Sequence, residues 1–237
     1  LFLNSNSHNN GRRVGGGGHG MYMMGHDNIL DGGSWYNNPY YGIQIYSSDS
    51  VTGVPSTIED DNIVRNARIF GNGAGPTTGG GLVLGTGHRN MAYNNLVYDN
   101  DGLGISSCCG GTNSVIANNI IDNNRGSGVE TQSGISSIKN NIISNNDAAV
   151  TLWYGYGGNK IQYNDFSENG QGNTVIDNAG KINTISNNLV STPLYVDRAA
   201  KNFKLQSTSP TIDKGTTMTE FNVDVDSIKL ALEERKK

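Results

Sequence analysis

The sequence predicts an all-β protein, a right-handed parallel β-helix, and two patterns that run in phase along the chain predict it. The first is a doubled asparagine, as in "ANNIIDNN" (117–124), which is followed 22 residues later by "KNNIISNN" (139–146). The second is a small residue followed by alternating apolar positions, as in "GIQI" (42–45) and "GLVL" (81–84). A fixed period of this length is typical of solenoids, in which each coil contacts only its neighbours.

The alternating segments predict one longer strand in each coil. Further copies are "GMYM" (20–23), "GISS" (104–107), "GVET" (128–131), "AVTL" (149–152) and the weaker "TVID" (174–177). Alternation over four residues directs one side chain inward and the next outward. The inward side chains are expected to stack as apolar columns. They are Met21, Met23, Ile43, Ile45, Leu82, Leu84, Val129, Val150 and Leu152.

The doubled asparagine predicts a corner between two shorter strands of the same coil. Its first position falls on Asn66, Asn94, Asn118, Asn140, Asn164 and Asn187. "NILDGGSWYNN" (28–38) aligns with "SVIANNIIDNN" (114–124), which places Gly32 and Gly33 at an equivalent corner. Asn and Gly both tolerate the left-handed backbone that such a corner needs. Stacked carboxamides would bond the coils above and below, so we assign these asparagines a structural role and no chemistry.

The solenoid is expected to form one domain over residues 1–216, and residues 217–237 are expected to form a capping segment or tail. "DSIKLALEERKK" (226–237) fits a short helix capped by Asp226 or Ser227, and an appended tail is the other interpretation. "LFLNSN" (1–6) resembles a late strand of a coil whose earlier part is absent. We therefore expect the chain to be a fragment or a processed form without its N-terminal coils.

Composition excludes two classes of partner. The net charge is −4, and only 16% of the residues are charged, so the chain has no basic field for a nucleic acid. No run approaches the 18 apolar residues of a membrane span. Cys108 and Cys109 are adjacent, and because neighbouring cysteines rarely satisfy disulfide geometry we expect them to be reduced and without a role. They do not fix the cellular compartment.

The chain resembles secreted bacterial β-helix proteins of the pectate lyase-like superfamily. The resemblance rests on the Asn corners, on the strands "HGMY" (19–22) and "YGIQIY" (41–46), and on "STPLYVDRAAKNFKLQSTSPTIDKGT" (191–216). It implies the β-helix fold over residues 1 to about 216 and an extracellular location. Members include pectate and alginate lyases, polysaccharide epimerases, glycoside hydrolases and phage tailspikes, so the fold leaves the reaction open.

One face of the predicted helix suits a polysaccharide. Its outward column is Tyr22, Gln44, Val83, Ser106, Glu130, Thr151 and Ile176, and the next row contains Met24, Tyr46, Gln132 and Trp153. Coils lie about 4.8 Å apart, close to the rise of one sugar residue, and aromatic rings offer flat apolar area with a polar edge. The expected substrate-binding residues are Trp35, Tyr41, Gln44, Tyr46, Glu130, Gln132 and Trp153.

The candidate catalytic residues gather at the N-terminal end of this face. Long insertions in residues 46–62 and 71–80 flank the first two strands, and function tends to lie where loops lengthen. Removal of the proton α to a uronate carboxylate needs a base, an acid and a positive charge. His or Tyr serves as base or acid, and Arg neutralises the carboxylate. The predicted set is Arg12, Arg13, His19, Tyr22 and His26.

Acidic residues close to the second strand suggest a calcium site. Asp49 and the run "IEDDN" (58–62), with Glu59, Asp60 and Asp61, offer the oxygen ligands that Ca²⁺ prefers. Such runs are more often only solvated. Calcium is the one cofactor that the sequence suggests.

Three functions remain open. The first is a lyase or epimerase acting on an acidic, uronic-acid-containing polysaccharide. The second is a non-catalytic carbohydrate-binding β-helix, such as an adhesin or tailspike-like module. The third is a structural or ice-binding solenoid, which would need a flat threonine-rich face that the varied column lacks. Hydrolysis is disfavoured because the column offers Glu130 without a second carboxylate, and the Asp-rich and RxK motifs of polygalacturonase-like members are not evident.

Overall fold

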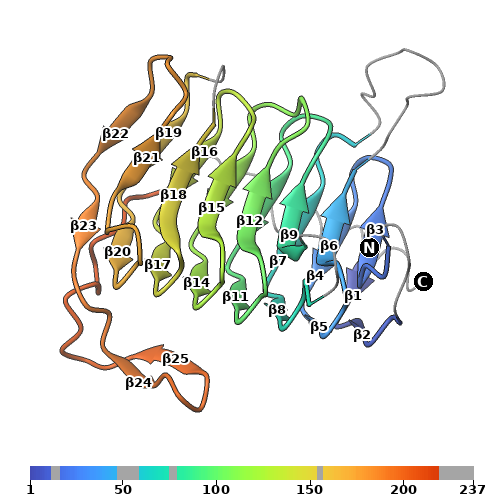
Figure 1. The fold of residues 1–237 in the computed structure, drawn as a ribbon, viewed down its shortest axis with the longest axis horizontal. Helices are drawn as coiled ribbons and strands as arrows, with labels where there is room; N and C mark the ends of the chain where they lie inside the picture. Colours follow the sequence, from blue (N-terminus) through green and yellow to red (C-terminus); the bar gives the residue numbers. More distant parts are fainter. Residues whose placement is uncertain (12–16, 47–58, 75–78, 154–156, 219–237) are drawn as a thin grey trace, which may run out of the picture.

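The computed structural model describes residues 1–11, 17–46, 59–74, 79–153 and 157–218, which form a solenoid of three parallel sheets. Figure 1 shows the coils stacked along the long axis of the molecule, with the longest strands side by side across one face. The described residues contain no helix, and therefore none that could cross a membrane. The predicted helix at 226–237 lies outside these residues.

Each of the first seven coils contributes one strand to each sheet, and the eighth contributes a described strand to sheets A and B. Sheet A contains Phe2–Leu3 (β1), Ile29–Asp31 (β4), Ile63–Arg65 (β7), Met91–Tyr93 (β10), Val115–Ala117 (β13), Ser137–Lys139 (β16), Lys160–Gln162 (β19) and Thr184–Ser186 (β22). Sheet B contains Asn6–His8 (β2), Ser34–Tyr36 (β5), Arg68–Phe70 (β8), Leu96–Tyr98 (β11), Ile120–Asp122 (β14), Ile142–Ser144 (β17), Asp165–Ser167 (β20) and Leu189–Val190 (β23).

Sheet C carries the longer strands that the alternating motif predicts. Its members are Met21–Met23 (β3), Tyr41–Ile45 (β6), Gly80–Leu84 (β9), Leu103–Ser107 (β12), Ser127–Thr131 (β15), Ala148–Leu152 (β18) and Val175–Asp177 (β21). The predicted inward residues of sheet C are buried, at 4% exposure or less, except Met21, which is partly buried against the core. The weak motif at 174–177 forms the last strand of this sheet.

The small residue that opens each sheet C motif is needed for close packing. A Cβ atom added to Gly81 would lie 2.5 Å from the carbonyl oxygen of Gly104 and 2.6 Å from Cγ1 of Val97. The neighbouring backbone and the core therefore leave no room for a side chain at this position.

Asparagine ladders stack at all three corners of the coil, where the sequence predicts one ladder. Between sheets A and B the ladder runs through Asn95, Asn119, Asn141, Asn164 and Asn188. Between sheets B and C it runs through Asn38, Asn72, Asn100, Asn124, Asn146, Asn169 and Asn173. Between sheets C and A it links Asn28, Asn62 and Asn90, and later Asn159 and Asn183.

The two asparagines of each pair have different tasks. Asn118 adopts a left-handed backbone with φ 55°, whereas Asn119 carries the buried carboxamide of the ladder. Asn119 Oδ1 accepts from the backbone nitrogen of Asn95 at 2.9 Å, and its Nδ2 donates to the carbonyl of Ala92 at 2.9 Å. Gly32, which aligns with Asn118, has a positive φ as that alignment predicts, whereas Gly33 has a positive φ that its counterpart Asn119 does not share.

One position of the predicted corner series is wrong by a single residue. Tyr163, not Asn164, takes the left-handed corner position, with φ 56°. Asn164 is the ladder residue, and its Oδ1 accepts from the side chain of Asn141 at 2.9 Å. In this coil the first asparagine of the pair is replaced by Tyr163, so the prediction took the second asparagine for the first.

A hairpin from the C-terminal segment covers part of the outer surface of sheet B. Tyr195–Asp197 (β24) pairs antiparallel with Asn202–Leu205 (β25), and Figure 1 shows the hairpin beside the last coils of the solenoid. Phe203 packs against Tyr98 with ring centroids 5.3 Å apart. Arg198 donates to Oδ1 of Asp122 at 2.5 Å, and the Asp122 side chain is only 1% exposed.

Replacing Asn119 by Ala should lower the free energy of unfolding by about 3 kcal/mol, because a buried backbone nitrogen and a buried carbonyl lose their partners. The matched control is Asn118→Gly, which keeps the left-handed corner and should change stability by less than about 1 kcal/mol. Urea denaturation followed by circular dichroism measures both. Equal losses for the two variants would contradict the division of tasks within the pair.

Replacing Arg198 by Ala should destabilise the hairpin by about 2–3 kcal/mol, because the buried Asp122 loses its cation. Arg125→Ala is the control, since the Arg125 side chain is 78% exposed and pairs with the partly exposed Asp101, and it should change stability by about 0–1 kcal/mol. Limited proteolysis within residues 194–205 reports release of the hairpin. Cleavage at the same rate in both variants would refute this role of Arg198.

Candidate functional site

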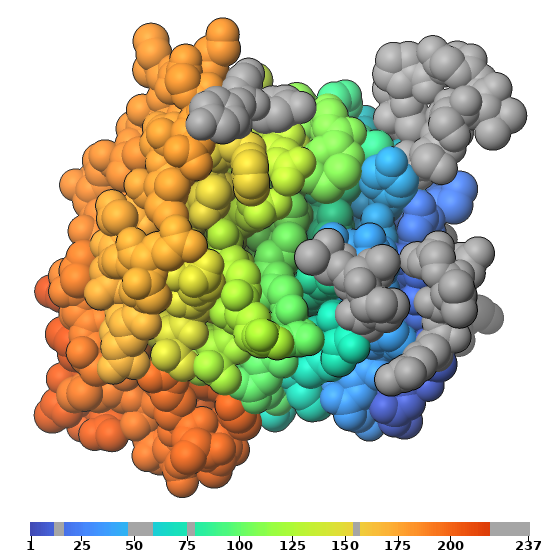
Figure 2. All heavy atoms as spheres, in the orientation of Figure 1, coloured from blue at the N-terminus to red at the C-terminus, as the bar shows by residue number. Residues whose placement is uncertain are grey.

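The outward surface of sheet C, called here the sheet C face, has the predicted register. Cα pairing places Tyr22, Gln44, Val83, Ser106, Glu130, Thr151 and Ile176 in one continuous column. Backbone hydrogen bonds extend the strands by one residue and align a second row of Met24, Tyr46, Gly85, Cys108, Gln132 and Trp153. Figure 2 shows the coils as successive coloured bands across this side of the molecule.

An aromatic cluster occupies the N-terminal end of the sheet C face. The imidazole of His19 lies edge-on to Tyr22, with centroids 5.3 Å apart, and edge-on to Tyr40 at 4.8 Å. Tyr41 stacks with His19 at 5.9 Å, and Tyr22 contacts Tyr46 at 6.4 Å. The structure therefore brings together four of the predicted site residues, His19, Tyr22, Tyr41 and Tyr46, and adds Tyr40.

Burial sets the protonation states of this cluster. Desolvation lowers the pKa of His19 below its usual 6.5, so the imidazole is neutral at neutral pH. Its Nδ1 is buried and has no hydrogen-bond partner among the described residues. Desolvation, with smaller contributions from Tyr46 and Glu59, raises the pKa of Tyr22. Burial and the neighbouring Tyr40 and Glu130 raise the pKa of Tyr41 to about 12. The cluster thus offers one neutral base beside protonated phenols.

The middle of the sheet C face carries both polar and apolar side chains. Val83 and Ser106 point outward but are only 3% exposed. Gln44 lies beside Val83, and its buried Oε1 has no hydrogen-bond partner in the described part of the chain. Glu130 accepts a hydrogen bond from Gln132 Nε2 at 2.9 Å, which holds a carboxylate and an amide together. Beyond them Trp153 is 41% exposed.

Several predicted site residues lie elsewhere. Trp35 is a correction, because its side chain is 2% exposed and belongs to the apolar core. In "SWY" the alternation of β5 directs Ser34 and Tyr36 outward and Trp35 inward. His26 lies beyond the opposite end of β3 from His19 and is paired with Asp27 at 2.7 Å. Arg12, Arg13 and Asp49 lie outside the described residues.

The acidic run near β7 is engaged by protein groups. Arg89 donates to Asp60 at 3.0 Å and to Asp61 at 2.6 Å. Glu59 is fully buried, and its Oε2 accepts a hydrogen bond from the hydroxyl of Thr86 at 3.1 Å. Within the described ranges, no group of three or more His, Cys, Asp or Glu side chains is arranged to hold a metal ion. A calcium site in this run remains only a prediction.

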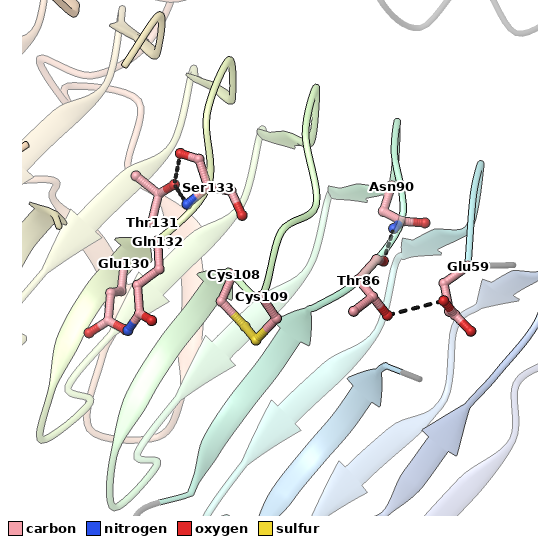
Figure 3. Close-up of a disulfide and its surroundings, with 9 residues drawn as sticks. All are labelled: Glu59, Thr86, Asn90, Cys108, Cys109, Glu130, Thr131, Gln132 and Ser133. Atoms are coloured by element: carbon pink, nitrogen blue, oxygen red, sulfur yellow. Dashed lines mark hydrogen bonds between the residues drawn. A yellow bond between two sulfur atoms is a disulfide. The ribbon is translucent and has the colours of Figure 1, made fainter. Parts of the chain in front are cut away.

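The adjacent cysteines are a second correction. Cys108 and Cys109 form a disulfide, whereas the sequence suggested reduced thiols. The two cysteines pair where the chain turns after β12, with Cys109 at φ 66° and Gly110 at φ 91°. In Figure 3 the disulfide projects from the same side of sheet C as Glu130 and Gln132. Sequence spacing alone gives no signal for this pairing.

A cavity of about 490 Å³ lies away from the sheet C face. It forms where residues 205–215 lie against the corner between sheets A and B, and it is lined by groups such as Asn140, Asp165 and Lys214. None of the predicted site residues lines it. Because its polar walls belong largely to the ladder corner and to the returning segment, we assign it no chemistry.

Two comparisons bear on the chain as a whole. Its structure matches the A-module of the mannuronan C-5 epimerase AlgE6 from Azotobacter vinelandii with a TM-score of 0.51 and 17% sequence identity. The match covers 81% of this chain and 57% of the epimerase module, so the chain spans little more than half of that module. At this identity the likeness shows the fold alone. No curated protein matches the sequence.

Family membership follows from the sequence itself. Residues 2–166 match the family model described as a right-handed β-helix region, and this stretch includes most of the coils described above. The match agrees with the handedness that the repeat pattern predicts. The chain therefore belongs to the right-handed β-helix family.

Proposed function

We propose that the sheet C face binds an acidic polysaccharide and that its aromatic cluster removes the proton α to a uronate carboxylate. The observation that carries this proposal is the contact between His19 and Tyr22 on an outward strand surface, with the pKa of His19 lowered and that of Tyr22 raised. A neutral imidazole accepts a proton, and a protonated phenol donates one. Both groups are thus in the required state at neutral pH.

The two reactions that fit this arrangement share their first step. His19 takes the C5 proton, and the electron pair of the C–H bond moves into the carboxylate to give an enolate. In epimerisation a phenol returns a proton to C5 from the opposite face of the sugar ring. In β-elimination the enolate expels the glycosidic oxygen, which the phenol protonates. Tyr22 and Tyr41, both within 6 Å of His19 by ring centroid, are the candidate donors for β-elimination, whereas epimerisation needs a donor across the sugar ring from His19.

The negative charge of the enolate requires a counter-charge or strong hydrogen-bond donors. Arg12 and Arg13 remain the predicted cations, and Ca²⁺ is the alternative source of positive charge. The described part of the sheet C face carries no Lys or Arg in its two outward rows. The likeness to a mannuronan epimerase module supports the uronan substrate only as an analogy of fold. An extracellular location accompanies a polymer substrate and is part of this proposal.

Carbohydrate binding without catalysis is the second candidate. It is favoured by Trp153, which is 41% exposed and lies several coils from the aromatic cluster, and by the Glu130–Gln132 pair between them. An aromatic platform and a polar pair suffice to hold a sugar chain. A binder tolerates loss of His19, whereas an enzyme does not.

Incubation with uronic-acid polymers, with and without Ca²⁺, should give either an unsaturated product or exchange at C5. Ultraviolet absorbance detects the unsaturated sugar of elimination, and deuterium uptake from heavy water, read by NMR, detects epimerisation. His19→Gln and Tyr22→Phe should each lower the rate by about 10²–10⁴-fold. Tyr36→Phe, on sheet B, is the control and should leave the rate unchanged. Absence of both signals on every polymer would leave the binding function.

The rate should fall on the acid side only below pH 6.5, the ordinary pKa of His. Burial lowers the pKa of His19, so the imidazole stays neutral and basic until the pH drops beneath that value. Protonation at lower pH removes the base and hence the activity. The Tyr22 and Tyr41 phenols, with raised pKa values, stay protonated through neutral pH. An acid limb of kcat/KM centred above pH 6.5 would argue against His19 as the base.

A further inference from the structure

The Cys108–Cys109 disulfide lies at the edge of the sheet C face, directly after the end of β12. Cys108 belongs to the second outward row, where its backbone nitrogen donates to the Leu84 carbonyl at 3.1 Å. Gln132 follows on the next coil, and its backbone nitrogen donates to the Ser107 carbonyl at 2.8 Å. In Figure 3 the two sulfur atoms lie between the Glu130–Gln132 pair and the coil of Thr86. The disulfide therefore occupies one coil position in the second outward row of the sheet C face.

The backbone fixes the disulfide in this orientation. Gly111 donates its backbone N–H to the carbonyl of Cys108 at 3.2 Å, which closes a four-residue turn. Both central residues, Cys109 and Gly110, have positive φ, as in a type I′ turn. Non-glycine residues seldom adopt positive φ. Cys108 is 8% exposed, and Cys109 is exposed, so the disulfide presents one sulfur-bearing edge to solvent.

The neighbouring coil extends this surface toward the aromatic cluster. Gly85 occupies the second row between Tyr46 and Cys108. A Cβ atom on Gly85 would lie 2.9 Å from Cδ2 of Tyr46, so the Tyr46 ring leans over this glycine. The row thus places an aromatic ring, a position without a side chain and a disulfide on successive coils. It forms a largely apolar strip with the polar Glu130–Gln132 pair at its far end.

We propose that the Cys108–Cys109 disulfide is a sugar-binding platform, a subsite that packs against the apolar C–H face of one residue of the polysaccharide. This inference rests on the proposed function. Sulfur is soft and polarizable and makes favourable contacts with apolar and aromatic groups. The bond between neighbouring side chains leaves little conformational freedom to be lost on binding. Gln132 and Glu130 lie one coil further on, where an amide and a carboxylate can bond the hydroxyls of the next sugar.

The spacing defines which oligosaccharides reach the platform. The strands β3, β6, β9 and β12 are consecutive in sheet C, so the disulfide lies three coils beyond the strand of Tyr22. Three coil spacings are roughly 14 Å. An oligosaccharide that begins at the aromatic cluster must therefore contain about four residues to contact the disulfide. Shorter oligosaccharides bind without it.

The first measurement is a thiol titration of the denatured, unreduced protein, which should find no free thiol and, after reduction, two. Isothermal titration calorimetry then compares uronic-acid oligosaccharides of increasing length in the His19→Gln background, in which conversion of the ligand is slowed. For lengths that reach the disulfide, the oxidised protein should bind about two- to tenfold more tightly than the protein reduced with a phosphine. For dimers and trimers the two forms should bind equally.

The double variant Cys108→Ser, Cys109→Ser is the matched control, because the reductant should not change its affinity. It should bind long oligosaccharides as weakly as the reduced protein does. Free thiols in the unreduced protein, or equal affinities of oxidised and reduced protein for long oligosaccharides, would overturn the platform while leaving the proposed function in place. Weakening at every length would also overturn it, since that result indicates a distorted turn. Absence of binding to all uronans would overturn both proposals.

Discussion

The stacked carboxamides of the asparagine ladders are the interaction on which the rest of the structure depends. Each coil turns three corners, and at each corner a backbone N–H points along the stack without a strand partner. The side-chain oxygen of a ladder asparagine accepts that N–H from the preceding coil, and its side-chain nitrogen donates to a carbonyl of that same preceding coil. Asn119 does this for Asn95 and Ala92. Because buried backbone groups must be paired, the corners fix both the coil spacing and the coil register.

A fixed register has a direct consequence for the sheet C face. Once the corners align, the outward side chains of successive coils form straight rows, and any ligand that crosses the coils meets one side chain per coil spacing. Close stacking of the coils also leaves no room for a side chain at Gly81 in β9, where a Cβ atom would meet the Gly104 carbonyl and the core residue Val97. The same packing that stabilises the solenoid therefore leaves the sheet C face free to vary.

The varied side chains of that face include most of the aromatic and titratable groups of the candidate site. His19, Tyr22, Tyr40 and Tyr41 gather at one end, and burial of this cluster separates the protonation states of imidazole and phenol. The disulfide and the Glu130–Gln132 pair follow along the same rows. A regular scaffold with an irregular face explains how one β-helix carries an imidazole–phenol cluster at one end and a disulfide with a carboxylate–amide pair further along.

The sequence alone determined the fold, the coil period and the outward column from Tyr22 to Ile176, because a repeat multiplies a weak local pattern until its register is unambiguous. The predictions at Asn164 and Trp35 were wrong. The corner next to Tyr163 lacks the doubled asparagine, and the strand of Trp35 alternates over only three residues, so neither position had the support of a full repeat. Tertiary structure decided the rest. Three features depend on how side chains of one turn or of adjacent coils lie in space. They are the contact of Tyr40 with His19, the burial that shifts the pKa values of the imidazole and the phenols, and the pairing of Cys108 with Cys109. Spacing along the chain does not encode these contacts.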